Sequence, residues 1–287
     1  MIVQGDHVVT TLNPRTPLDR ALRLGTVSWS VAGRELSLSA DVFLETLDQL
    51  FNRGVRVDLL LASGRPLLED PCPSDVLSRT GDTPVIFGVG PRWLLIQQGE
   101  QDRAEAVVLR TRQVLARSDA GRSDYLSFTN QILAGRGVIR VADLELTLVL
   151  FICGENNALR IDGRKSSVLR YPGPGLAEIL GGRWVALNPA HRPYWPQVRS
   201  KGFAKVGRTV DGSGPTMGRV VGLRQPYDDG TIPPIAFVHT NNFLADKPRT
   251  RRYASVAFGA HAAGPPICAE IEADGRKVQW CFSAYGL

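Results

Sequence analysis

Residues 146–160, which read LTLVLFICGENNALR, bring a cysteine to the end of an apolar run. Cys153 is followed at once by a glycine, a glutamate and two asparagines, so a buried strand here would deliver a thiol to a sharp polar turn. A nucleophile at a strand end needs such a turn, because the following backbone N–H groups must face the reacting atom. Gly154 permits the turn, and a helix starting near Asn156 would favour the thiolate. The pattern also fits a core strand that simply ends in a small residue.

The segments around this cysteine predict a mixed α/β chain. Residues 137–153 predict a pair of strands that turns near Asp143 and ends at Cys153. Residues 39–54 carry apolar residues at helical spacing between a serine N-cap and a glycine C-cap. This helix lies between two strand-like runs, ALRLGTVSWSV and VRVDLLLA. That order predicts a β-α-β unit whose two strands are parallel.

Most of the remaining chain also reads as strand. The runs are TPVIFGVG, RWLLIQQ, AEAVVLRTRQVL, RWVALNP, GRVVGLR, PIAFVHT, RYASVAFGA and KVQWCFSAYG. Helices are expected over GLAEILGG and YWPQVRSKGFAKVGR, whereas GRPLLEDPCPSD and residues 116–135 are expected to be irregular. We predict an irregular lead-in over residues 1–20 and a single domain over residues 21–287, with two layers of sheet and helices outside them.

The composition describes a globular chain with a basic surface. A hydrophobic content of 43% is ordinary for such proteins, and 287 residues suffice for a sizeable core. The net charge of +6 permits contact with nucleic acid. No basic cluster is interleaved with aromatic residues as a single-strand binder requires, so a solvated surface is the favoured interpretation. No phosphate-binding loop and no C-x-x-C pair occurs, so we expect neither a cofactor nor a metal.

The first residues of the chain and its cysteine content indicate the cellular compartment in which we expect the protein. Nothing in the first twenty residues resembles a secretory leader, and the apolar run at 146–152 is too short to span a bilayer. We therefore expect a cytoplasmic protein with no membrane contact. Its four cysteines, at positions 72, 153, 268 and 281, are expected to be reduced.

The cysteine turn resembles the nitrilase superfamily of carbon–nitrogen hydrolases. That family has a strand followed by Cys-x-Glu or Cys-x-Asp, and some nitrilases carry Cys-Trp-Glu-Asn where this chain has Cys153-Gly154-Glu155-Asn156. The run VALNPAHRPY is similar to a later strand of the family that ends in Asn-Pro. The resemblance implies an α/β fold of four layers, an α-β-β-α sandwich. It also implies a small amide or nitrile ligand and, by analogy with the family, a homodimer.

The resemblance implies three catalytic residues, of which this sequence shows one. The nucleophilic cysteine maps to Cys153, which would attack an amide or nitrile carbon. The family's general base is a Glu that follows its second strand, but this chain reads Ala62-Ser63-Gly64 there, and Glu69 is the nearest substitute. The family's Lys should lie before the nucleophile, yet no lysine precedes Lys165. Positive charge would have to come from Arg110, Arg112 or Arg117, although an arginine does not readily give up its proton.

Further polar side chains are candidates for the same site. Glu155 is either a second carboxylate at the thiol or a cap on the backbone amides of the turn. His191 follows a strand end and is either a base for Cys153 or a surface histidine. Tyr194 is either a pocket wall or a core residue. Asn188, from the Asn-Pro match, and His239 complete the expected substrate-binding group.

Three functions remain open at this point. The first is a diverged, non-catalytic nitrilase-fold protein that serves as a binding or regulatory subunit. The second is an active cysteine-dependent amide or nitrile hydrolase with relocated base and oxyanion groups. The third is a cationic module that contacts nucleic acid.

Overall fold

A computed structural model describes residues 9–14, 18, 21–31, 37–115, 121–159, 167–190, 226–246, 251, 254–273 and 275–287. Several predictions from the sequence fall outside these residues. They concern His191, Tyr194, Arg117, the helix expected over YWPQVRSKGFAKVGR and the strand expected over GRVVGLR.

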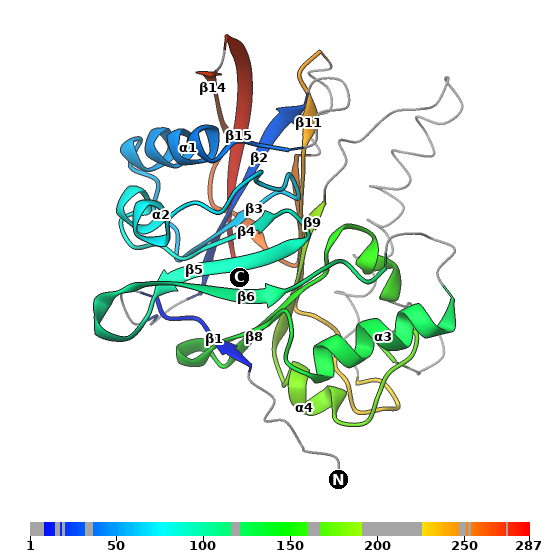
Figure 1. Cartoon of the computed structure of the whole chain (residues 1–287). Helices are drawn as coiled ribbons and strands as arrows, with labels where there is room; N and C mark the ends of the chain where they lie inside the picture. The colour runs from blue at the N-terminus through cyan, green and yellow to red at the C-terminus, as the bar shows by residue number, and fades with distance from the viewer. Residues whose placement is uncertain are drawn as a thin grey trace.

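Within the described residues, the larger of two sheets has nine strands. Strands β2 to β6 of this sheet lie side by side in Figure 1. Its order is β13-β15-β2-β3-β4-β5-β6, with β11 beside β2 and β14 beside β15. The strands are β2 (Arg23–Val31), β3 (Leu59–Ala62), β4 (Val85–Val89), β5 (Arg92–Gln98), β6 (Ala104–Arg110), β11 (Phe243–Leu244), β13 (His261–Ala262), β14 (Ile267–Ala273) and β15 (Arg276–Gly286). The three strands β2, β3 and β4 are parallel, as the predicted β-α-β unit requires.

Within the same described ranges, the smaller sheet has six strands in the order β1-β7-β8-β9-β10-β12. They are β1 (Thr10–Thr11), β7 (Val138–Val141), β8 (Leu146–Leu150), β9 (Trp184–Ala190), β10 (Ala236–Asn241) and β12 (Ser255–Phe258). β7 and β8 form the predicted antiparallel pair, joined by a 3₁₀ turn, η2 (Ala142–Leu144), that contains Asp143. β8, β9 and β10 are parallel, so their carboxyl ends lie at one edge of the sheet.

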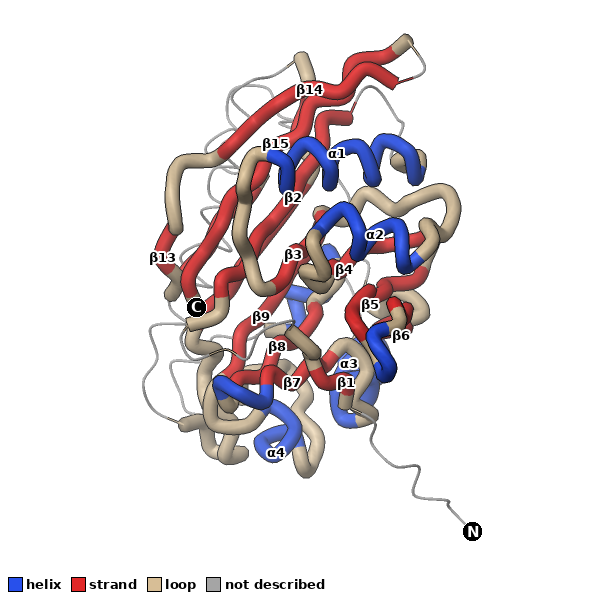
Figure 2. Tube along the Cα trace, turned by 90° about the vertical axis from the view of Figure 1, so that its left-hand side faces the viewer, coloured by secondary structure: helices blue, strands red, loops and turns tan. Residues whose placement is uncertain are grey.

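Helices cover the outer face of each sheet, which confirms the predicted α-β-β-α sandwich. Helices α1 (Ala40–Asn52) and α2 (Pro73–Thr80) lie on one side, and α3 (Arg122–Leu133) and α4 (Leu176–Leu180) on the other (Figures 1 and 2). A short 3₁₀ turn, η1 (Glu100–Asp102), joins β5 to β6. Three apolar cores fill the spaces between the four layers.

Helix α1 forms for the local reasons read from the sequence. The Ser39 side chain accepts a hydrogen bond from the Val42 backbone N–H, and Gly54 follows with φ of +78°. Phe43 and Leu47 are fully buried against the nine-stranded sheet. The helix therefore closes one outer layer with its apolar face.

The space between the sheets is apolar at its centre and polar toward one side. Leucine and isoleucine side chains of both sheets meet at the centre. Pairs of buried polar groups then bridge the sheets, with Ser28 Oγ 3.0 Å from Thr240 Oγ1 and Thr26 Oγ1 2.8 Å from Ser255 Oγ. Such directional contacts fix how the two sheets are placed against each other, which apolar contact alone does not.

Two helices were missed in the sequence. α2 begins inside the proline-rich segment, because Pro73 occupies the first helical turn, where its fixed φ and missing N–H are tolerated. α3 lies in residues predicted to be irregular. Its buried Tyr125, Phe128 and Ile132 recur at helical spacing, and this signal was outweighed by the many polar residues between them.

The expectation of four reduced cysteines was wrong. Cys268 on β14 and Cys281 on β15 stand directly opposite each other in the antiparallel pair and form a disulfide. β14 itself was not predicted, so this pairing could not be foreseen. Cys72 and Cys153 are free thiols. Within the described part of the chain, no helix is long and apolar enough to cross a membrane.

Replacing Gly25 with alanine is expected to destabilise the fold. A Cβ at this position would lie 2.8 Å from Phe282 Cε2 and 3.1 Å from Leu60 Cδ1, so the buried neighbours must shift. We expect Gly25→Ala to lower the free energy of unfolding by about 1–3 kcal/mol, measured by urea denaturation. Gly182→Ala is the matched control, because a Cβ there meets nothing within 4 Å. Equal stability of the two variants would contradict this account of the core.

Candidate functional site

Cys153 lies at a strained turn just beyond β8. The Phe151 N–H donates to the Leu187 carbonyl at 2.7 Å, so pairing with β9 continues almost to the cysteine. A 3₁₀ turn, η3 (Cys153–Ala158), follows in place of the helix expected from near Asn156. Cys153 itself has φ of +47°, in the left-handed region that non-glycine residues rarely adopt. Such strain persists only where the surrounding structure enforces it, and it concentrates at functional sites.

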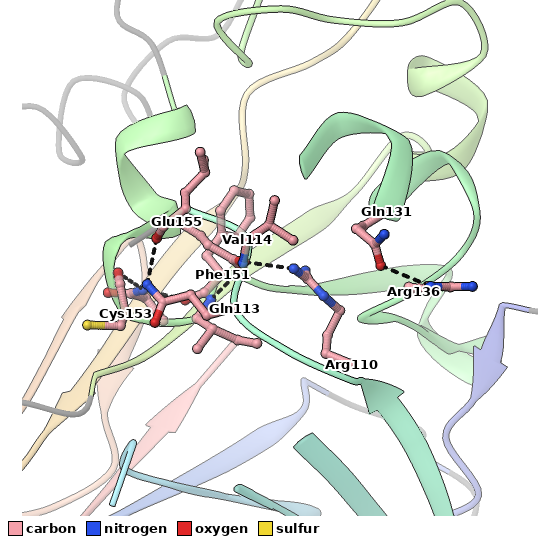
Figure 3. Close-up of polar contacts among 11 residues, drawn as sticks. Arg110, Gln113, Val114, Gln131, Arg136, Phe151, Cys153 and Glu155 are labelled. Atoms are coloured by element: carbon pink, nitrogen blue, oxygen red, sulfur yellow. Dashed lines mark hydrogen bonds and ion pairs between the residues drawn. The ribbon is translucent and has the colours of Figure 1, made fainter. Parts of the chain in front are cut away.

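The thiol faces the space between the two sheets. Cys153 is half-buried and packs against the apolar core that lies there. In Figure 3 its sulfur points to the side opposite Arg110. Among the described residues, no hydrogen bond to the Cys153 sulfur is formed, and the cysteine is a free thiol.

Carboxyl ends of strands from both sheets meet near this turn. The Gly64 N–H, just after β3, donates to the carbonyl of Ala190 at the end of β9, at 2.9 Å. Ser63 Oγ donates to Asn242 Oδ1, just after β10, at 2.6 Å. The edge formed by the carboxyl ends of parallel strands is where α/β proteins commonly bind ligands. The position where the resemblance placed a catalytic Glu is thus occupied by a serine that is hydrogen-bonded to an asparagine.

Glu155 is fully buried and turned toward the backbone and an arginine. Its Oε1 accepts hydrogen bonds from Arg110 Nη2 and the Val114 N–H, both at 2.7 Å. Its Oε2 accepts one from the Ile152 N–H at 2.9 Å. Of the two roles considered for Glu155, this is the cap on the backbone of the turn, with an ion pair added.

The protonation of Glu155 follows from its partners. Burial raises the pKa of Glu155, and the charge of Arg110 together with the two backbone N–H groups opposes that rise. Burial likewise lowers the pKa of Arg110, and the attraction of Glu155 opposes it. All three groups that reach the carboxyl are donors, so both of its oxygens must act as acceptors. The arrangement therefore suits an ionised Glu155 beside a charged Arg110.

A second set of contacts holds the same turn through Asn188. Its Nδ2 donates to the carbonyl oxygens of Phe151 and Cys153, the latter at 2.9 Å. Its Oδ1 lies 2.7 Å from His239 Nδ1. Because this oxygen can only accept, His239 Nδ1 must carry the proton, and Nε2 is then the acceptor in the neutral ring.

His239 lies across the smaller sheet from the thiol. Side chains alternate between the two faces of a strand. Ala186 and Phe237, two residues before Asn188 and His239, pack against the core under α3 and α4. Cys153 packs against the core on the other face, between the sheets. The structure thus places Asn188 and His239 behind the cysteine turn, where they support it from the outer side.

Two other expected residues lie apart from this cluster. Glu69 and Arg112 are both exposed, and neither makes any of the contacts described for the turn. Of the arginines considered, Arg110 reaches Glu155, and Arg117 lies outside the described residues. Within the described ranges, no three His, Cys, Asp or Glu side chains come together as metal ligands.

Comparison with known proteins gives a likeness in shape only. No protein-family model matches the chain, and no curated protein does either. Solved structures similar to it include an amidase from Nesterenkonia sp., 11% identical over 93% of this chain and 91% of that one, with a TM-score of 0.37. Another is a cysteine-to-serine variant of the Nesterenkonia AN1 amidase from the nitrilase superfamily, 10% identical over 78% of each chain, with a TM-score of 0.36. These values are too low to carry any conclusion about activity.

The largely buried, partly exposed position of His239 predicts a loss of stability in mild acid. Burial lowers its pKa from the ordinary 6.5 to about 4, against the opposing effect of the hydrogen bond to Asn188. The unfolded chain therefore binds a proton at higher pH than the folded chain does. The free energy of unfolding should fall by about 1–2 kcal/mol as pH drops from about 6.5 to about 4, after allowance for partial exposure.

The control for this effect is His239→Asn, which keeps a donor toward Asn188 but does not titrate. Urea denaturation across the pH range should show the acid-dependent loss in the wild type and a smaller loss in the variant. Parallel curves for the two proteins would mean that another group causes the loss.

Strain at Cys153 predicts that glycine is tolerated better than alanine at this position. Both substitutions remove the thiol, but only glycine accepts φ of +47° without a steric penalty. We expect Cys153→Gly to be more stable than Cys153→Ala by about 1 kcal/mol, measured by thermal and urea denaturation. A more stable alanine variant would show that the turn has a different backbone conformation in solution.

Proposed function

We propose that the chain is a diverged nitrilase-fold protein that binds a small amide or nitrile beside Cys153 without the usual hydrolysis. One observation carries this proposal: Glu155, the carboxylate nearest in sequence to the thiol, is committed to Arg110 and two backbone N–H groups. It is therefore not positioned to take a proton from the sulfur.

The other catalytic positions support the same conclusion. A general base must lie within hydrogen-bond reach of the proton that it removes. The segment where the resemblance placed the family's Glu contains Ser63, which is bonded to Asn242. A missing base typically costs about 10²–10⁴ in rate, and a missing oxyanion donor about 10²–10³. Together these losses would leave little turnover at this thiol, while a ligand-sized carbonyl or nitrile could still be bound.

An active hydrolase is the second candidate, and the conformation of Cys153 favours it. A non-glycine residue at φ of +47° is strained, and two buried networks hold it there. Strain of this kind is typical of nucleophiles that are held ready for reaction. This candidate requires a base and a cation other than Glu155 and Arg110, whose hydrogen bonds are directed at each other.

Ammonia release separates these two candidates. Purified protein is incubated with butyramide and with butyronitrile, and ammonia is measured against Cys153→Ala. We expect no ammonia above the variant, together with a rise in the melting temperature of the wild type when either compound is present. Ammonia that depends on Cys153 would establish the active hydrolase. Absence of both ammonia and a thermal shift would refute binding of these ligands.

A further inference from the structure

The structure assigns to the Arg110–Glu155 ion pair the task of positioning Cys153 and of keeping the charge of Glu155 from acting on the thiol. The inference deepens the proposed function, since it concerns the same cysteine. Its evidence, however, is independent of any ligand. It rests on the contacts around η3 that Figure 3 shows.

The carboxylate of Glu155 joins two parts of the chain that are far apart in the sequence, residues 110–114 and Ile152. Arg110 ends β6 in the larger sheet, Val114 follows it, and Ile152 directly precedes Cys153. Each contributes one donor to the two oxygens, at 2.7, 2.7 and 2.9 Å. The backbone N–H of Ile152, the residue before the cysteine, is thus held by a charged, buried acceptor.

The peptide after the cysteine is held from the other side. Asn188 donates to the Cys153 carbonyl at 2.9 Å and also to the Phe151 carbonyl. With the Ile152 N–H and the Cys153 C=O both fixed, the backbone of Cys153 has little freedom to leave its left-handed conformation. The direction of the Cα–Cβ bond, and hence of the sulfur, follows from that backbone.

Arg110 is tightly enclosed by its neighbours on the side of the turn away from the thiol. Its side chain is fully buried, and its guanidinium lies 5.5 Å from the centre of the Phe128 ring. A Cβ on Gly137, which has φ of +75°, would lie only 3.1 Å from Arg110 Cδ. Arg110 Nε and Nη1 have no hydrogen-bond acceptor among the described residues. Of the three guanidinium nitrogens, Nη2 is the one that donates to Glu155.

Stability alone does not account for such a pair. Apolar residues of similar volume often replace a buried ion pair without loss of stability, because desolvation of the charges offsets their attraction. Removal of one partner alone is costly, since it leaves an unpaired buried charge. The location of this pair, one residue from a strained thiol, is what points to a positioning role.

The effect of substituting Arg110 on the ionisation of the Cys153 thiol depends on the charged and titratable groups around the turn. Among the described residues they are Glu155, Arg110, Arg136 near Arg110, His239 behind Asn188, and Arg170, whose Nε donates to the Asn157 carbonyl of η3 at 3.0 Å. Loss of Arg110 leaves the carboxylate of Glu155 without its cation, two residues from the sulfur. A nearby negative charge disfavours a thiolate. Removal of the carboxylate as well should cancel this effect.

The experiment is alkylation with iodoacetamide across pH, read at each cysteine by peptide mass spectrometry. We expect Arg110→Met to move the midpoint for Cys153 to higher pH and to slow its alkylation about tenfold at pH 7, the change that one pKa unit produces. The double variant Arg110→Met with Glu155→Gln should return the midpoint to the wild-type value. Arg110→Lys should give an intermediate profile, because a lysine keeps the charge but not the planar geometry.

Two controls separate positioning from general loss of structure. Cys72 is an exposed free thiol on the other side of the fold, so its alkylation serves as an internal standard. Gly25→Ala lowers stability far from the turn and should leave the Cys153 midpoint unchanged. Glu155→Gln and Arg110→Lys supply the result if Arg110→Met does not fold.

An unchanged Cys153 profile in a folded Arg110 variant overturns the inference, as does a change in which Cys72 follows Cys153. Neither outcome depends on ammonia release or on binding of butyramide, so this inference and the proposed function fail separately.

Discussion

The carboxylate of Glu155 has no access to water, and the local structure is arranged around that fact. An ionised group in such a place requires donors on every side, and Arg110, Val114 and Ile152 provide them. These donors come from both sheets, so the contact also joins the end of β6 to the end of β8. A single buried charge thus connects the two halves of the sandwich at the point where the cysteine leaves its strand.

Further buried polar contacts lie at the same end of the molecule. Ser63 with Asn242 and Gly64 with Ala190 connect the carboxyl ends of strands from different sheets. A sandwich held only by leucine and isoleucine side chains could shift by one residue with little penalty, whereas these hydrogen bonds permit one arrangement. The positions of the strand ends at the candidate site are therefore fixed by the hydrogen bonds that join the two sheets.

Local signals explain which parts of this arrangement the sequence predicted. The helix that begins at Ala40 was foreseen because a serine N-cap, apolar residues at helical spacing and a closing glycine lie within sixteen residues. The end of β8 was foreseen because an apolar run stops at a glycine-containing turn. The partner of Glu155 was not, because Arg110 lies 45 residues away in another sheet. Likewise, the contact between Asn188 and His239 depends on the register of β9 against β10, which no short motif encodes.

Gly137 shows how this geometry limits the residue types that fit beside the buried ion pair. Its backbone lies in the left-handed region, and a Cβ there would press on the stem of Arg110, so two separate causes disfavour a side chain at this position. Loss of the arginine would remove the steric cause but not the backbone one. A larger residue at position 137 would displace Arg110 and leave the buried carboxylate of Glu155 without its cation. The effect of a substitution at position 110, 137 or 155 on the free energy of unfolding is therefore expected to depend on the residues at the other two positions.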